Sequence, residues 1–316
     1  MSTLMPRRGT AAISISTTSL DPRDRDTVAV RESIAGACLC GSRLPLQVRF
    51  GLRSRTRPVV EGRWCCSEQC LKARVASFVR RGLPKHSLRQ EHQHRVPLGL
   101  LLLSQSAITQ EQLRFARDHA ECTGERIGTV LVQHCGLSEQ RLVQGLAAQW
   151  GCTAWDVRGD IPDGMACVAP YAVLRAAEML PLRAHADGTI SVAFADAPDA
   201  QAVFAIRRIH DRPVDAGIAA VSDFVAAVEH IKQQTAVSVL EFHCEDEADL
   251  VRGITRTIQR HAPVESRWAR VHDMVWVRMW LEPSAFAGGL QQTEDVMDFI
   301  FHLPGETGIA QNVKSF

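Results

Sequence analysis

The spacing of apolar residues divides the chain into a helical stretch, a mixed stretch and a C-terminal stretch. From residue 98 to residue 150, apolar side chains recur at helical intervals. Thr109 and Ser138 each precede a polar first turn and then an apolar stripe. A hydroxyl side chain at that position accepts a hydrogen bond from a free backbone N–H group, so helices are predicted to begin after both residues.

A different pattern follows between residues 152 and 234. Residues 179–182 and 189–194 are short β-like runs separated by Asp187-Gly188, a pair that favours a hairpin turn. Helices are predicted over residues 199–210 and 222–232, with a strand within 213–220 between them. These elements together predict a small α/β unit.

The last eighty or so residues show fewer signals. A helix is predicted over 247–261 and a strand over 274–280, whereas the remaining tail gives only weak indications. The acidic run 245–247 lies ahead of the helix, where negative charge stabilises a helix N-terminus. Trp268, Trp276 and Trp280 are expected in the core of a small C-terminal α/β extension spanning 236–316.

The N-terminal part has little apolar periodicity. Residues 1–31 are rich in Ser, Thr, Arg and Asp and are expected to form a disordered lead-in. The longest apolar run in the chain, residues 96–103, is far shorter than the roughly 20 residues that a membrane-spanning helix needs. With no signal-peptide pattern either, we expect a cytoplasmic protein.

Five of the ten cysteines fall between residues 38 and 70, which suggests a metal site in the region 32–94. Cys38 and Cys40 come from a Cys-x-Cys-Gly turn, and Cys66 and Cys70 flank the start of a predicted helix capped by Ser67. Four such sulfurs fit a closed, structural Zn²⁺ site, with Cys65 as an alternate for Cys66. The Cys-Ser-x-x-Cys element resembles the second half of treble-clef zinc fingers of the FCS and TRASH type. Buried free thiols or a redox pair are the alternatives.

The net charge of +1 conceals an uneven distribution. Residues 41–95 carry an excess of ten positive charges, while 96–235 and 236–316 each carry an excess of five negative charges. The basic block could contact nucleic acid phosphates or an acidic protein surface, but aromatic residues for base stacking are scarce there. A solvated basic face is the third interpretation.

The helical stretch contains an internal repeat with an offset of 29 residues. Residues 98–99 align with 127–128, Leu102 with Leu131, and Leu113 with Leu142. The two copies are blocks of 24 residues, 97–120 and 126–149, separated by a five-residue spacer.

This layout resembles the MshEN domain, the N-terminal domain of type II secretion and type IV pilus assembly ATPases. The resemblance covers about 95–235 and implies a helical subdomain over 95–150 and an α/β half over 151–235, hence an α+β fold overall. The second copy matches the family motif at Arg126, Ile127, Gly128, Leu131, Leu142, Leu146 and Gln149. The first keeps Leu98, Gly99, Leu102 and Leu113 but has Pro97, Arg117 and Ala120 in place of Arg, Leu and Gln.

The resemblance implies cyclic diguanylate as a ligand, bound by the two motifs together. Arg126 would bind a phosphate, the apolar side chains of both copies would face the bases, and Gly128 would allow close backbone approach. The same pattern has a plainer explanation, in which the leucines form a core, the glycine is a packing contact and Gln149 is solvated.

The phosphate-binding loop of the secretion ATPases, Gly-x4-Gly-Lys-Ser/Thr, is missing from this sequence. No serine-hydrolase or zinc-protease motif is found either. We therefore expect a non-enzymatic receptor or adaptor that binds cyclic diguanylate and acts in secretion, pilus or related surface processes. A protein-docking scaffold with a degenerate nucleotide site and a zinc-finger regulator that binds nucleic acid are the alternatives.

Overall fold

The structure is a computed structural model that describes Cys38 and residues 40–42, 58–82, 95–157, 161, 164–224, 227, 231, 238–287, 290 and 294–303. The expected lead-in over 1–31 lies outside these residues. Helices and sheets alternate along the chain, which confirms the predicted α+β class. In the part of the chain that is described, no helix combines the length and the apolar character needed to cross a bilayer.

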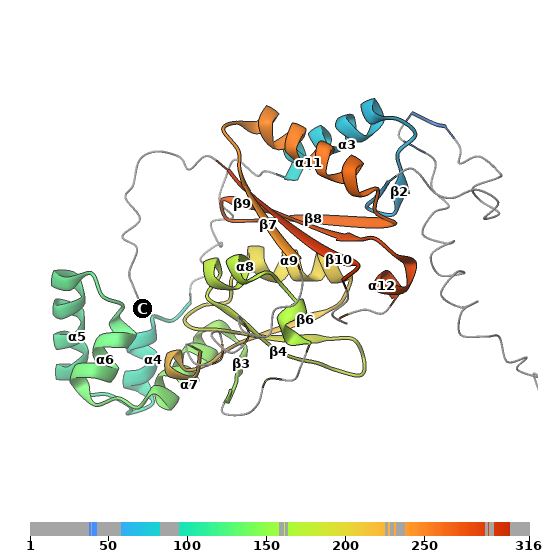
Figure 1. Cartoon of the computed structure of the whole chain (residues 1–316). Coiled ribbons are helices and arrows are strands. Elements are labelled where there is room, and N and C mark those ends of the chain that lie inside the picture. Colours follow the sequence, from blue (N-terminus) through green and yellow to red (C-terminus); the bar gives the residue numbers. More distant parts are fainter. Residues whose placement is uncertain are drawn as a thin grey trace, which may run out of the picture.

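The repeat folds as four helices (Figure 1): α4 (Leu98–Ser104), α5 (Gln110–Thr123), α6 (Ile127–Cys135) and α7 (Glu139–Trp150). Both predicted N-caps are confirmed. The Thr109 side chain accepts a hydrogen bond from the Gln112 backbone at 3.2 Å, and the Thr109 N–H donates to the Gln112 side-chain oxygen at 2.7 Å. Ser138 accepts a bond from the Arg141 backbone at 3.3 Å. Each cap satisfies a backbone donor that the helix leaves free.

The α/β half contains a four-stranded sheet in the order β3-β6-β5-β4, formed by β3 (Thr153–Ala154), β4 (Met179–Ala184), β5 (Ile190–Phe194) and β6 (Val214–Ile218). Strands β4 and β5 form the predicted antiparallel hairpin. Helix α9 (Ala200–His210) then crosses over, so that β6 pairs parallel to β5. The 3-10 turn Met165–Cys167 and helix α8 (Tyr171–Ala176) precede the hairpin, and the described residues within 222–232 are helical as predicted.

The C-terminal part forms a second four-stranded sheet in the order β7-β10-β9-β8. Its strands are β7 (Ser238–His243), β8 (Glu265–Val271), β9 (Met274–Trp280) and β10 (Val296–His302), with α11 (Glu247–His261) and α12 (Pro283–Ala287) between them. Figure 1 shows α11 on one face of this sheet and α9 of the α/β half on the other. Trp268, Trp276 and Trp280 are all buried, as predicted.

The cysteine-rich region packs against this C-terminal sheet. Helix α3 (Glu68–Gly82) lies beside α11 (Figure 1), and the hairpin of β1 (Val59–Val60) and β2 (Arg63–Trp64) joins the edge at β8. The Glu61 N–H donates to the Ser266 carbonyl at 2.8 Å, and the Gly62 N–H contacts both carboxylate oxygens of Glu265 at 3.0 Å. The described residues of regions 32–94 and 236–316, which the sequence suggests as separate units, are therefore in contact.

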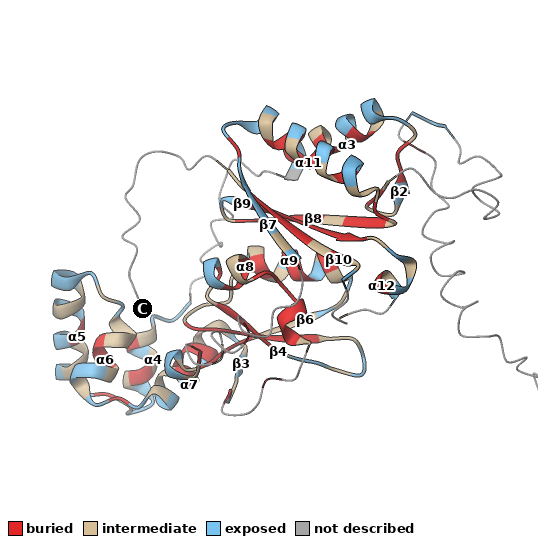
Figure 2. Ribbon diagram, in the orientation of Figure 1, coloured by how far each residue is buried: buried red, intermediate tan, exposed pale blue. Residues whose placement is uncertain are grey.

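Burial is concentrated between the two four-stranded sheets (Figure 2). Phe194 of β5 belongs to the same buried cluster as Trp276 of β9 and Ile300 of β10. Arg208 of α9 adds a polar link, because its side chain pairs with Glu61 at 3.0 Å and donates to the Trp268 carbonyl at 2.8 Å. The α/β half and the C-terminal sheet thus share one core.

Candidate ligand and metal sites

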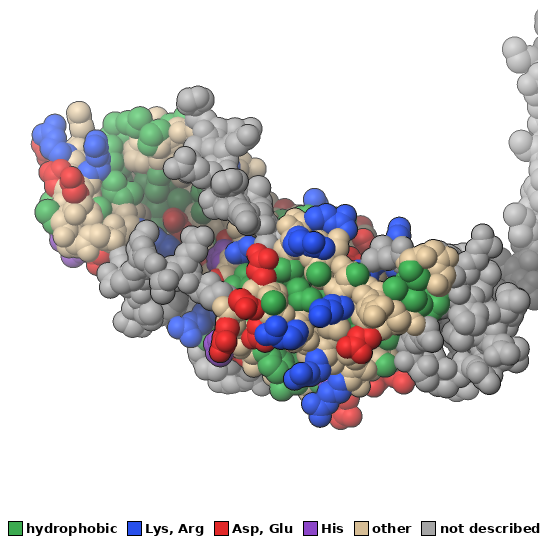
Figure 3. Space-filling model, turned by 90° about the horizontal axis from the view of Figure 1, so that it is seen from above, with side chains coloured by type: hydrophobic (Ala, Val, Ile, Leu, Met, Phe, Trp, Pro, Cys, Tyr) green, Lys and Arg blue, Asp and Glu red, His purple; other side chains and the backbone are tan. Residues whose placement is uncertain are grey.

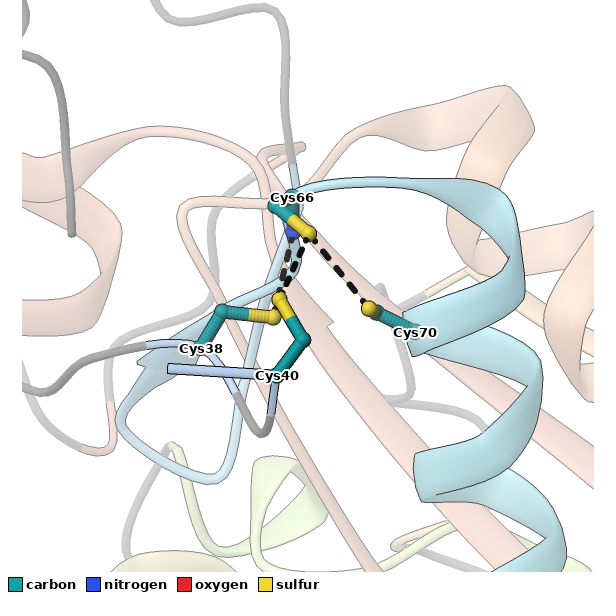
Figure 4. Close-up of side chains that lie close together, drawn as sticks. All are labelled: Cys38, Cys40, Cys66 and Cys70. Carbon is teal, nitrogen blue, oxygen red and sulfur yellow. Dashed lines mark hydrogen bonds between the residues drawn. The ribbon is translucent and has the colours of Figure 1, made fainter. Parts of the chain in front are cut away.

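Four of the five clustered cysteines converge in space (Figure 4). The Sγ atoms of Cys38, Cys40, Cys66 and Cys70 all lie within 4.8 Å of one another. The Cys66 sulfur is 3.3 Å from that of Cys40 and 3.4 Å from that of Cys70. Four Zn–S bonds of about 2.3 Å in a tetrahedron place the sulfurs about 3.8 Å apart. Only small movements of the four sulfurs would therefore give the spacing that a bound metal ion requires.

Local structure explains how two sequence segments supply these sulfurs. At Gly41 the backbone has a φ of 81°, which favours glycine, and the Gly41 N–H closes a turn onto the Cys38 carbonyl. On the other side, Ser67 caps α3 by accepting a bond from the Cys70 N–H at 3.3 Å. The cap fixes Cys70 in the first turn of the helix, and the Cys66 N–H points at the Cys38 sulfur at 3.5 Å.

The electrostatics of the cluster favour a thiolate at Cys40. Hydrogen bonds from the side chain and backbone of Ser42 lower the pKa of Cys40 to about 6. A proton shared with the neighbouring sulfurs, chiefly that of Cys40, raises the pKa of Cys66 to about 12. Because thiolates are the metal-binding form of cysteine, a cluster with one sulfur already ionised near neutral pH can hold a metal ion.

Cys65, the suggested alternate, points elsewhere. Its side chain is buried among Val60, Leu71 and other apolar residues of α3 and the sheet. Burial raises the pKa of its thiol to about 11. The structure therefore uses Cys65 as a core residue and brings Cys66 into the sulfur cluster.

In the helical half, the two repeat copies have the same internal packing. Gly99 lies against Leu113, and Gly128 lies against Leu142, whose Cδ1 would be 3.1 Å from a Cβ added at that glycine. A side chain at Gly99 would overlap Leu113 outright. Both glycines therefore allow two helices of a copy to approach closely, which is the packing role considered above.

Two of the motif leucines, Leu102 and Leu131, form the core of the helical half, whereas Leu146 belongs to the core of the α/β half. Leu102 and Leu131 are fully buried, and Leu146 is 4% exposed. Leu98, Ile127 and Leu142 are only partly buried. A flat ligand could reach the partly buried group without repacking, but not the fully buried pair.

Arg126 is paired with an acidic residue of the α/β half. It occupies the N-cap of α6, and its guanidinium donates to both carboxylate oxygens of Glu178, at 3.0 and 3.2 Å. Asp196 lies 3.9 Å away. The hydrogen bonds with Glu178 raise the pKa of Arg126 further above its already high value. The Arg126 side chain is nevertheless 54% exposed, so it is accessible from solvent.

Gln149, which closes the second copy, reaches back to the beginning of the first. Its Nε2 donates to the Val96 carbonyl at 2.9 Å. Next to it, the Arg95 guanidinium lies 3.7 Å from the centroid of the Trp150 ring. These contacts bring the two ends of the repeat together, as a shared ligand site would require.

A cleft of about 320 Å³ lies between α7 and the α/β half. Its lining includes Glu139, Asp156 and Asp223, and none of the predicted ligand residues. Three carboxylates repel a phosphate ligand, so this cleft does not fit a cyclic dinucleotide.

The sequence did not predict two groups of charged or titratable residues that the structure places beside the repeat helices. Glu178 is one; it lies 52 residues from Arg126 in the chain, and no local pattern connects the two. The other comprises His119, Glu125 and His134, which come together around the spacer between the two copies. A search for histidine and acidic residues across predicted helix pairs could have found this second group.

Comparison with known proteins identifies the class of domain. Residues 160–238 match the MshEN domain family, so the chain contains an MshEN domain, as its resemblance implies. The match covers most of the α/β half, and the helical repeats precede it.

Among solved structures, a structure of MshE with cdg is similar at 26% identity and a TM-score of 0.38, covering 43% of this chain and 99% of that one. The N-terminal domain of XpsE is similar at 23% identity and a TM-score of 0.32, covering 42% of this chain and 91% of that one. No curated protein matches the chain.

Proposed function

We propose that this protein is a non-enzymatic receptor or adaptor whose MshEN domain binds cyclic diguanylate in secretion, pilus or related surface processes. The observation that supports it best is the geometry of the second repeat copy. Arg126 occupies the N-cap position of α6 and has a solvent-accessible guanidinium, and Gly128 in the first turn of that helix packs on Leu142. A guanidinium beside the free N–H groups of a helix N-terminus suits a phosphate.

Ligand binding would require Arg126 to exchange partners. A phosphate oxygen pair can replace the Glu178 carboxylate with the same two-point geometry. Glu178 and Asp196 together repel an anion, so the exchange opposes binding until the ligand gains its other contacts. In this proposal, Glu178 acts as a built-in competitor that sets the affinity.

Isothermal titration of the full chain with cyclic diguanylate tests the proposal. We expect saturable binding in the wild type, and a loss of about tenfold to hundredfold in Arg126→Ala because a charge-assisted phosphate contact is removed. Arg141→Ala, which removes an exposed arginine of α7, serves as the control and should bind like the wild type. No heat at a ligand concentration of about 100 μM contradicts the proposal.

A docking scaffold without a nucleotide is the second candidate, and two observations favour it. Arg126 already has a two-point partner, and the equivalent position in the first copy is Pro97. In that case Arg126→Ala leaves protein partner binding unchanged, and the titration with the dinucleotide is flat.

We also propose that the four converging cysteines hold a structural Zn²⁺. Metal analysis of the purified chain should give about one equivalent at this cluster, lost in Cys70→Ser because one of four ligands is removed. Cys65→Ser is the matched control and should keep the metal, since that sulfur is buried away from the cluster. Equal metal content in both variants would contradict the assignment.

Binding of nucleic acid through the basic block receives less support from the described part of that block, which leaves out residues 43–57 and 83–94. Seen from the side of α3 and α11, basic and acidic side chains are interspersed (Figure 3). Exposed Lys72 and Arg80 of α3 share this face with Glu68 at the start of the same helix. A mixed surface of this kind gives weak attraction for a phosphate backbone.

A further inference from the structure

Three potential metal ligands meet at the spacer between the two repeat copies. His119 comes from the last turns of α5, Glu125 from the spacer and His134 from the last turn of α6. Their ligand atoms all lie within 4.8 Å of one another. The His119 Nε2 is 3.7 Å from a Glu125 carboxylate oxygen, and the two imidazole centroids are 4.9 Å apart.

Neighbouring groups contact the two imidazole rings and fix the backbone of Glu125. The Phe115 ring stacks on His119 at 5.7 Å and meets His134 edge-on at 6.5 Å. Glu125 follows Gly124, which ends α5 in the left-handed conformation, and its N–H donates to the Thr123 side chain at 3.2 Å. The backbone that presents the carboxylate is therefore fixed by the helix end.

A second stacked histidine pair in the chain shows that proximity alone does not make such a site. His243 and His302 are paired across β7 and β10 with centroids 4.7 Å apart, and His302 contacts Glu241 at 2.9 Å. Within the described residues, however, this trio does not bring its ligand atoms together as the His119 trio does. The strand pair provides a natural comparison, with the same residue types in a different geometry.

We propose that His119, Glu125 and His134 bind a divalent transition-metal ion, with Zn²⁺ as the ion that fits best. Two imidazole nitrogens and one carboxylate oxygen form a ligand set that Zn²⁺ prefers, with a fourth position open to water or an external ligand. Bonds of about 2.0–2.1 Å require the ligand atoms to be about 3.4 Å apart. The three side chains are partly or fully exposed, so their rotation can shorten the distances between the ligand atoms to this value.

This site would connect the end of α5, the spacer and the end of α6. It is chemically different from the cysteine cluster, because it contains no sulfur. It does not depend on nucleotide binding, so either proposal can fail while the other stands.

Cobalt titration of the full chain separates the two metal sites. The chain is first given one equivalent of Zn²⁺ to fill the cysteine cluster, and Co²⁺ is then added. We expect one further equivalent, with visible d–d absorption and no thiolate-to-metal charge transfer in the near ultraviolet. Because a direct ligand is lost, His134→Ala and Glu125→Gln should each weaken Co²⁺ binding at least about tenfold.

The matched control is His302→Ala, which disrupts the histidine pair on the strands and should leave Co²⁺ binding unchanged. The proposal is overturned if no second equivalent binds, if both His134→Ala and Glu125→Gln bind like the wild type, or if His302→Ala loses as much affinity as they do. The last result would mean that Co²⁺ binds surface histidines in general. Circular dichroism confirms that each variant is folded.

Discussion

At the scale of single residues, the C-terminal sheet contains a buried ion pair. Arg278 of β9 and Asp298 of β10 are 3% and 1% exposed, and two hydrogen bonds of 2.8 and 2.6 Å join them. Trp276 donates a third bond to Asp298 at 2.7 Å. The stability of such a pair depends on the presence of both partners, since either charge alone would be buried without a counter-charge.

Asp298→Asn should therefore destabilise the protein by about 3 kcal/mol, because it leaves the Arg278 guanidinium buried without a counter-charge. Urea unfolding measures the change. The double variant Arg278→Met, Asp298→Asn should recover part of the loss, since the uncompensated charge is then absent. A change below about 0.5 kcal/mol in the single variant, the size typical of surface substitutions, would contradict the argument.

His210 makes stability depend on pH. Complete burial, and then the positive charge of Arg278, lower its pKa from the ordinary 6.5 to about 3, while its Nε2 bonds to the Val168 carbonyl at 2.7 Å. Between these two values the unfolded chain binds a proton that the folded chain does not. This contribution to stability is therefore complete above pH 6.5 and is lost as the pH falls toward 3.

Between pH 6.5 and pH 5 the expected loss is roughly 2 kcal/mol. His210→Gln should remove that part of the pH dependence, as measured by urea unfolding at several pH values. His243→Gln, at an exposed position of β7, should retain the wild-type slope. If both variants keep the slope, another group is responsible.

At the scale of elements, the two repeat copies place equivalent residues in the same backbone conformation. Pro97 caps α4 with φ −55° and ψ 137°, and Arg126 caps α6 with φ −69° and ψ 137°. An arginine can adopt the first pair of angles without strain. The chain can therefore accept the residue that the family motif has at this position.

Pro97→Arg should raise the affinity for cyclic diguanylate by about tenfold to hundredfold, because it supplies a second phosphate-binding guanidinium. Titration calorimetry measures the gain. Pro97→Ala is the control for loss of the ring and should not increase the affinity. An unchanged affinity in Pro97→Arg would favour the scaffold without a nucleotide.

The sequence predicted most helices and the β4–β5 hairpin but missed β7, β8 and β10. Strand β8 pairs with β9 across the short turn at 272–273, but its polar residues interrupt the apolar pattern. Strand β7 pairs with β10, which is far away in the chain. Strand β10 is largely apolar and was missed all the same. In β8, Glu265 and Ser266 are buried because they bond to Gly62 and Val59 of the hairpin. In β10, Asp298 is buried against Arg278. Hydrogen bonds to residues that are distant in the chain leave no local signal for the burial of these polar side chains.

The candidate sites differ in the same way, because the geometry of one is set locally and that of the other depends on a distant segment. The convergence of the four cysteines was predictable, because a turn and a capped helix fix their local geometry. The environment of Arg126 was not, since its partner Glu178 is supplied by the α/β half. Nor did the motif reveal which leucines would be buried, because a core residue and a ligand-facing residue share the same helical spacing.

At the scale of the whole molecule, the Arg126–Glu178 pair links the helical half to the α/β half. Glu178→Gln should raise the affinity for cyclic diguanylate by up to about tenfold, because the competing carboxylate charge is removed. Titration calorimetry checks this. Thermal stability should change little, since the pair is partly exposed and such pairs contribute only about 0–1 kcal/mol.

Asp187→Asn, in the turn between β4 and β5, serves as a charge control and should leave the affinity unchanged. Weaker binding in Glu178→Gln would contradict the competitor role.

The attachment of the β1–β2 hairpin to β8 has a consequence for how the chain matures. Glu61 and Trp268, which share a hydrogen bond, are 207 positions apart. During synthesis the cysteine segment leaves the ribosome long before β8 exists, and the helical repeats and the α/β half are synthesised in the interval. The unit formed by the cysteine-rich region and the C-terminal sheet is thus discontinuous in sequence, because the helical repeats and the α/β half lie between its two parts. Its assembly requires closure of a very long loop, so it should form last and most slowly.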